Sequence, residues 1–285
     1  LRSGGLAIYG TVIFAISALI IFCCIKKKKF FQMIDTLIPQ LALGQAMGRW
    51  GNFFNCEVHG NEVLLSNWSW IPSFITKQMQ YTSIAGGANI STSEGYIYLP
   101  LFFIEGLTNL FGYFFIAHLF GGKLRKITEL GDLAYGYVIW YGMTRVILEP
   151  MRNPKFIMND LWSWFWALVF VFAGACAIVG NHVIEYIKAK KKGEFKARES
   201  WRTSSFIQLI GFGALSVALI AVGVAIMTNA PTKEFIVPTN LHGVDFLQYN
   251  FGFIFVACGA SLLPFITMPI IRLVELNKIK ERVSE

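Results

Sequence analysis

Seven stretches of this chain are long, apolar and nearly free of charge. They span residues 6–24, 31–47, 101–120, 133–148, 161–187, 206–227 and 251–271. A helix of roughly 20 apolar residues crosses a bilayer, whose hydrocarbon core is about 30 Å thick, and satisfies its own backbone hydrogen bonds there. Because 55% of the residues are hydrophobic and only 15% are charged, the chain is far more apolar than an average soluble domain. The sequence therefore predicts an all-α polytopic membrane protein with about seven transmembrane helices.

Positive charge gathers on every second connection between these stretches. Of the 25 lysines and arginines, 18 lie within segments 26–29, 123–126, 188–202 and 272–282. Connections rich in lysine and arginine stay in the cytoplasm, so we expect the connections at 51–100, 151–160 and 230–249 to face outward. Attraction to anionic membrane lipids accounts for the net charge of +8, and we expect no nucleic-acid partner.

Two non-membrane segments divide the chain. Residues 58–98 predict a small head region on the outer face, and the basic segment 188–203 predicts a cytoplasmic linker. The membrane core would then comprise residues 1–203, followed by a transmembrane hairpin over 204–285. Pro264 and Pro269 fall in the last apolar stretch. Proline removes a helical hydrogen bond and clashes with the preceding turn, so we expect a kink there.

The five cysteines give no sign of a metal site. Cys23, Cys24, Cys176 and Cys258 fall in apolar stretches, where cysteine is usually a small buried hydrophobe. Cys56 stands in a polar run, but nothing beside it in the sequence marks an activated thiol. Because the spacings of the cysteines do not match those of metal ligands, we expect neither a metal nor a cofactor.

A polar run follows the second apolar stretch. It reads GRWGNFFNCEVHG over residues 48–60 and contains Arg49, Asn52, Asn55 and Glu57. Ionisable groups at membrane depth are costly unless they find partners, so they are rare there. An arginine that reaches up to the lipid headgroups is the structural explanation for this run. Chemistry on a lipid headgroup is the functional explanation.

A second polar cluster, YGMTRVILEPMR over residues 141–152, ends the fourth stretch. Its members Tyr141, Arg145, Glu149 and Arg152 follow helical spacing and would share one face. Arg145 and Glu149 are four residues apart, so an internal salt bridge is the structural alternative. Both clusters lie at the outer level, however, and two arginines at one depth suit a phosphate, because guanidinium presents paired donors to phosphate oxygens. We therefore expect a site for a phosphorylated amphiphile.

These motifs resemble the blocks of a known family. GRWGNFFNCEVHG, GGLAIYG at 4–10, LPLFFIE at 99–105, GDLAYGY at 131–137 and YGMTRVILEPMR occur in the order of the prolipoprotein diacylglyceryl transferases of bacteria. The resemblance covers roughly residues 3–190. It implies that further N-terminal membrane helices would precede Leu1, and that 204–285 extends beyond the usual family end. It also implies a plasma-membrane enzyme whose active site faces outward.

The resemblance implies a reaction and roles for individual residues. Such an enzyme transfers the diacylglyceryl group of phosphatidylglycerol to the lipobox cysteine of a prolipoprotein and releases glycerol phosphate. Arg49 and Arg145 would bind the phosphate, Glu149 would orient Arg145, and Glu57 with Asn52 would position the headgroup. The full set that it assigns is Arg49, Asn52, Glu57, Arg145, Glu149 and Tyr9 as catalytic, and Arg49, Arg145, Gly60, Asn55, Tyr141 and Glu105 as substrate-binding.

The chain departs from the family pattern at a few positions. Tyr9 stands where many members have a histidine proposed as the base, and His59 stands where an aromatic residue is frequent. Leu99 and Ile104 replace the usual histidine and tyrosine of the third block. These changes leave open an inactive paralogue that binds lipid or lipoprotein. A transporter is the remaining alternative, although the charges gather at one face and no inverted repeat is visible.

Overall fold

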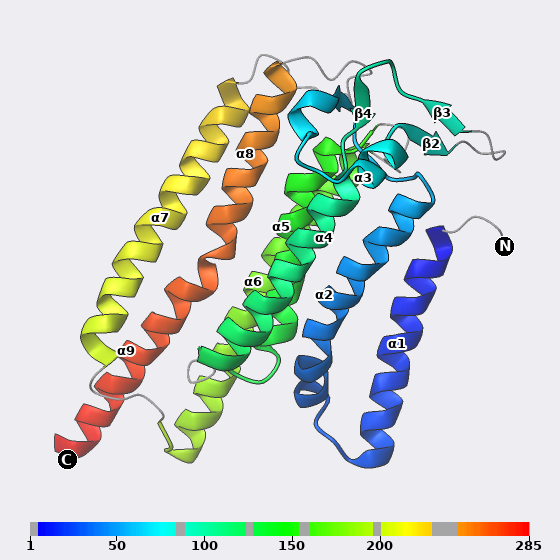
Figure 1. The fold of residues 1–285 in the computed structure, drawn as a ribbon. Helices are drawn as coiled ribbons and strands as arrows, with labels where there is room; N and C mark the ends of the chain where they lie inside the picture. Colours follow the sequence, from blue (N-terminus) through cyan, green and yellow to red (C-terminus); the bar gives the residue numbers. More distant parts are fainter. Residues whose placement is uncertain are drawn as a thin grey trace.

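The computed structural model describes residues 5–83, 89–123, 128–153, 160–195, 201–229 and 244–284 (Figure 1). Long helices dominate this part of the chain and lie alongside one another, with α1 and α7 at opposite edges of the bundle. The helices of the bundle are α1 Gly5–Lys26, α2 Phe30–Phe54, α4 Leu101–Phe114, α5 Asp132–Leu148, α6 Asp160–Lys192, α7 Trp201–Asn229, α8 Val244–Ser261 and α9 Leu263–Ser284. A π-helical segment, η2 Phe115–Lys123, continues α4.

Four helical stretches of the described chain are long and apolar enough to cross a membrane. They are Leu101–His118, Phe165–Lys192, Arg202–Asn229 and Phe251–Val283. The protein is thus a multi-pass helical membrane protein. The other three expected stretches fall in α1, α2 and α5, which are helical but shorter or less apolar over the described residues.

The last apolar stretch is broken where the prolines predict a disturbance. The helix α8 ends at Ser261 and α9 begins at Leu263, so Pro264 occupies the first turn of α9. A proline is tolerated there because that N–H has no partner within the helix, whereas a continuous helix would bring its ring against the carbonyl four residues earlier. Pro269 remains inside α9. The basic segment 188–203 is helical at both of its ends, in the last turns of α6 and the start of α7, and residues 196–200 lie outside the described part.

The segment 58–98 contains short strands that the sequence analysis did not anticipate. Strand β1 Glu62–Leu64 pairs with β4 Tyr96–Tyr98, and β2 Tyr81–Ser83 pairs with β3 Asn89–Ser91, both antiparallel. The 3₁₀ turn η1 Leu65–Trp68 and the helix α3 Ser73–Gln78 complete it. Three-residue strands are too short to show an alternating pattern. We call 58–98 the head; it lies at the end of the bundle where α2 finishes and α4 begins (Figure 1).

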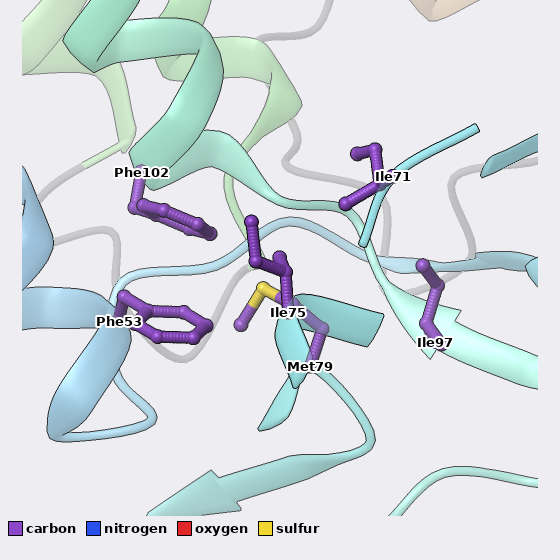
Figure 2. Packing of buried hydrophobic residues seen from close by; sticks show 6 residues of the cluster. All are labelled: Phe53, Ile71, Ile75, Met79, Ile97 and Phe102. Atoms are coloured by element: carbon purple, nitrogen blue, oxygen red, sulfur yellow. The ribbon is translucent and has the colours of Figure 1, made fainter. Parts of the chain in front are cut away.

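A hydrophobic core attaches the head to the bundle. Figure 2 shows its six buried residues, which come from α2, the head and α4: Phe53, Ile71, Ile75, Met79, Ile97 and Phe102. The rings of Phe53 and Phe102 lie 4.6 Å apart between centroids. Burying these side chains fixes the end of α2 against the start of α4, and both helix ends carry residues of the site described below.

Helix α5 is held from its other side by small residues. Val146 packs with Ala167 and Val171 of α6 and with Ala257 and Ala260 of α8. The approach to α6 is close at Gly142, where an added Cβ would lie 2.6 Å from the carbonyl oxygen of Ala167. Glycine is therefore needed at this crossing, and the position of α5 relative to α6 follows from it.

A polar junction fixes α2, α5 and α6 at the end of the bundle opposite the head. The carboxylate of Asp35 accepts hydrogen bonds from the amides of Gly131 and Ala134 at 2.7 and 3.1 Å, which satisfies donors in the first turn of α5. Buried Asp132 lies 2.8 Å from both Asn181 Nδ2 and His182 Nε2. The Asp35 that interrupts the second apolar stretch is thus a helix cap in the described structure.

Candidate functional site

The arginine of the first motif pairs across the bundle. Arg49 lies near the end of α2, and its Nε is 2.6 Å from Oε2 of Glu105 on α4. Glu105 is only 3% exposed, and a carboxylate can be this buried because cations neutralise it. The core around Phe53 and Phe102 sets the two helix ends that bring these charges together.

In the second motif, the predicted helical contacts are present between Tyr141, Arg145 and Glu149 but do not continue to Arg152 on the same helix. Arg145 Nη1 lies 3.1 Å from Glu149 Oε2, and Arg145 Nε donates a hydrogen bond to the Tyr141 hydroxyl at 3.2 Å. The helix α5 ends at Leu148, and Glu149–Met151 form a 3₁₀ turn, η3, in which Pro150 stands near the start. Arg152 consequently leaves the helix in an extended conformation instead of continuing the face.

Arg152 joins the two motifs. Its Nη2 donates to Glu105 Oε1 at 2.8 Å, and its Nε lies 3.6 Å from Glu149 Oε2. An unbroken series of ion pairs therefore runs Arg49–Glu105–Arg152–Glu149–Arg145. We call these five residues the arginine cluster.

The arginine cluster carries an excess of positive charge. The charge of Arg49 interacts favourably with Glu105 and unfavourably with Arg145 and Arg152, and Arg145 is itself attracted by Glu105. Three guanidinium groups therefore share one electrostatic environment with two carboxylates. A partly buried site with one uncompensated cation attracts an anion, and guanidinium matches phosphate oxygens in geometry.

Backbone contacts hold the chain of the first motif beside Arg152. Gly60 forms an antiparallel bridge with Arg152, and its amide donates to the carbonyl of Leu99 at 3.0 Å. A Cβ at position 60 would lie 2.6 Å from the carbonyl oxygen of Met151 and 2.7 Å from Leu99 Cβ. Gly60 thus lets three segments of the chain meet next to the arginine cluster.

Comparisons with known proteins bear on this geometry. A family model described as prolipoprotein diacylglyceryl transferase matches residues 1–180. The chain belongs to this family. A phosphatidylglycerol–prolipoprotein diacylglyceryl transferase from Listeria monocytogenes serotype 4b (strain CLIP80459) is 38% identical over 159 residues, which cover 55% of this chain and 52% of the relative. The protein of that name from Clostridium botulinum (strain 657 / Type Ba4) is 34% identical over 160 residues, which cover 56% of the chain and 58% of the relative.

The chain spans about half the length of the curated diacylglyceryl transferases that it matches. No solved structure gives a significant match to it. The matched region contains both arginine motifs and the head, so the arginine cluster lies within the part of the chain that defines its membership of the diacylglyceryl transferase family.

The remaining transferase-motif residues lie in the last turn of α2, which contains Asn52, and in the turn that follows it. Asn55 Nδ2 donates to Glu57 Oε1 at 3.1 Å, and the amide of Glu57 donates to the carbonyl of Asn52 at 3.0 Å. Cys56 and Val58 adopt positive φ angles of 50° and 55° in this turn. The contacts of the described residues bring Arg49, Glu105, Arg145, Glu149 and Tyr141 together, and join none of Asn52, Asn55 and Glu57 to an arginine. Tyr9 belongs to α1, and its side chain lies outside the described part.

Two further side chains of the first motif, Cys56 and His59, are buried and make contacts within the protein. Burial raises the pKa of the Cys56 thiol, which disfavours the thiolate, and Gln78 Nε2 donates a hydrogen bond to its sulfur at 3.0 Å. His59 is 2% exposed; its Nε2 lies 2.6 Å from the Thr82 hydroxyl, and its ring stacks on Tyr98. His59 is therefore a packed residue inside the head.

Sequence reasoning assigned no role to Arg152, although Arg152 connects the two halves of the site. Its spacing from Glu149 pointed to the same helix face, but the interruption of α5 at Leu148 changes its direction. Glu105 entered only through the resemblance. A single glutamate in an apolar helix was the available signal, because such a group needs a buried cation.

Proposed function

We propose that this protein is the catalytic part of a phosphatidylglycerol–prolipoprotein diacylglyceryl transferase. The observation that carries the proposal is the arginine cluster, in which motifs from α2 and from the end of α5 supply three cations around two buried carboxylates. Membership of the family and the names of the relatives support the same reaction. Phosphatidylglycerol is an anionic amphiphile, and two arginines at the outer level of the membrane suit its phosphate.

The arginine cluster would bind the phosphate of the lipid. Each guanidinium has five N–H donors, and the ion pairs to Glu105 and Glu149 use only some of them. The carboxylates would hold the arginines in place, and the unused donors would contact the phosphate oxygens. This preorganised positive field would stabilise the charge that develops on the departing glycerol phosphate.

In the proposed reaction, the thiolate of the lipobox cysteine attacks the glyceryl carbon that is bonded to the phosphate oxygen. A carbon–sulfur bond forms, the carbon–oxygen bond breaks, and glycerol phosphate leaves with the electron pair. The thiol proton passes to a base before or during attack, since the thiolate is the nucleophile. Tyr9 is the residue that the family resemblance puts in the position of this base, and Asn52, Asn55 and Glu57 would contact the headgroup beside Arg49.

The proposal includes an orientation in the membrane. Seven transmembrane helices would put the head and the arginine cluster at the outer face of a bacterial plasma membrane, with the basic segments 26–29 and 188–192 in the cytoplasm. Phosphatidylglycerol would enter from the outer leaflet, and the prolipoprotein signal peptide would present its lipobox there. Residues 1–203 would form the transferase core, and 204–285 an additional hairpin.

A transfer assay tests the proposal. The purified protein would be incubated in detergent with phosphatidylglycerol and a lipobox peptide, and the thioether product would be detected by mass spectrometry. We expect product from the cysteine peptide and none from a serine peptide. A correctly folded protein that binds both substrates but makes no thioether would instead match the inactive-paralogue alternative and would overturn the proposed activity.

A further inference from the structure

We propose that a second, uncharged polar layer beneath the arginine cluster binds the ester oxygens of the lipid substrate. Its members are Gln45 on α2, Asn109 on α4 and Tyr137 on α5. The proposal rests on the proposed function, because it concerns the part of the same lipid that lies below its phosphate. It adds a binding region for the diacylglyceryl portion, which the arginine cluster does not explain.

The register of three helices creates this layer. Gln45 precedes Arg49 by four residues on α2, and Asn109 follows Glu105 by four residues on α4. Because α2 runs toward the head and α4 runs away from it, both positions lie about one turn, roughly 5.4 Å, deeper in the bundle (Figure 1). Tyr137 precedes Arg145 by about two turns on α5, so it lies deeper in the bundle than Arg145.

The contacts of these side chains place them inside the bundle. Asn109 and Tyr137 are each 8% exposed, and Asn109 shares the buried face of α4 with Glu105 and Gly112. The side chains of Gln45 and Tyr137 lie close enough to interact, and this pair connects α2 with α5. The ring of Tyr137 stacks on Tyr141, and the Tyr141 hydroxyl accepts the bond from Arg145. Tyr137 therefore lies beside Tyr141, the hydrogen-bond partner of Arg145 in the arginine cluster.

An apolar floor closes this layer. Ala42 and Ile116 are buried beside Tyr137, and Ile38 and Leu133 pack around them. The polar layer is thus confined between a charged layer and a hydrocarbon-like layer. A glycerophospholipid has the same order of chemistry along its length, namely phosphate, ester groups and acyl chains.

The chemistry of the layer favours a neutral ligand with acceptor oxygens. Amide and phenol groups carry no charge, so they add little to phosphate binding, but each offers N–H or O–H donors to a carbonyl. Polar groups between membrane helices are costly when unsatisfied. The Gln45 and Asn109 amides each carry two N–H donors. Ester carbonyls could accept hydrogen bonds from these donors, whereas acyl chains could not.

The experiment compares two lipids and two proteins. Binding of phosphatidylglycerol and of its diether analogue, which keeps the headgroup but lacks both carbonyls, would be measured on the purified chain in detergent micelles. We expect the unaltered protein to prefer the ester lipid by roughly fivefold for each hydrogen bond lost. Gln45→Met and Asn109→Leu should lower that preference toward one, because their effect should disappear when the lipid has no carbonyl to bind.

Matched variants make the result specific. Thr108→Val removes a hydroxyl beside Asn109 that bonds Ile104 of its own helix, and it should keep the full preference. Tyr137→Phe removes only one oxygen atom. It is the replacement test variant if Gln45→Met or Asn109→Leu unfolds, and it should also lower the preference for the ester lipid. Folded layer variants that discriminate between the lipids as the unaltered protein does would overturn this inference. If the unaltered protein binds neither lipid, the proposed function itself fails.

Discussion

Arg49 is held by Glu105, whose carboxylate lies 2.6 Å from its Nε, and not by the glutamate of its own motif. The pair joins α2 to α4, and Arg152 extends it to the end of α5. A motif that looks continuous in sequence is therefore divided in space. Its arginine belongs to the arginine cluster, while Asn55 and Glu57 bond each other in the turn that follows α2.

Replacing Glu105 tests whether the two halves of the site depend on this carboxylate. Glu105→Gln preserves shape but leaves Arg49 and Arg152 without their shared counter-ion. Removing one partner of a buried ion pair typically costs about 3 kcal/mol, so we expect a clear fall in stability together with loss of transfer. Chemical unfolding in detergent would measure it. Glu62→Gln, on exposed β1, should change stability by less than about 0.5 kcal/mol; a similar small effect at Glu105 would contradict the structural role.

Arg145 should be essential for transfer and dispensable for folding. Arg145→Ala removes a cation that is exposed enough to reach a ligand, with 25% of its side chain accessible. We expect the transfer rate to fall by about 10²-fold or more, while the fold is retained because Glu149 keeps Arg152 as a partner. Arg145→Lys should recover little, because lysine lacks the planar fork of donors. The exposed Lys77→Ala on α3 is the control, and substantial turnover by Arg145→Ala would mean that the pair with Glu149 is only structural.

Two glycines of the first motif should respond differently to alanine. Gly60→Ala would place a methyl group 2.6 Å from a backbone oxygen of Met151, and we expect a loss of about 1–3 kcal/mol from overpacking. Gly51 lies in α2 with no atom within 4 Å of an added Cβ, so Gly51→Ala should leave stability unchanged or raise it by up to about 1 kcal/mol. Thermal unfolding of both variants checks the contrast, and equal effects would argue against the close packing at Gly60.

The junction at the far end of the bundle should affect stability without affecting the site. Asp132 accepts bonds from the Glu129 amide, Asn181 and His182. Asp132→Asn replaces one acceptor oxygen by an NH₂ donor. This donor would face one of the three N–H donors, so we expect a loss of stability of about 1–3 kcal/mol. The KM for phosphatidylglycerol of the folded fraction should not change. Glu185→Gln, which weakens the surface pair with Lys188, should be nearly neutral; a raised KM in Asp132→Asn would connect this junction to the site.

Much of the helical architecture could be predicted from periodic and charge-poor stretches. The expected window 133–148 differs by one residue at its start from the observed α5, Asp132–Leu148. The strands of the head could not be predicted, because three residues carry too little pattern. The number of membrane spans stays a prediction beyond the four stretches that satisfy length and composition among the described residues.

The amino-acid sequence by itself determined that the chain is a helical membrane protein and that Arg49 and Arg145 are candidates for one phosphate site. Hydrophobic length and the position of charge are local properties, so they can be read directly from residue order. Only the tertiary structure decided that Glu105 and Arg152 join those arginines and that Gln45 meets Tyr137 beneath them. These contacts link residues that are far apart in the chain, and they depend on helix register and on the core that docks the head, which no local pattern specifies.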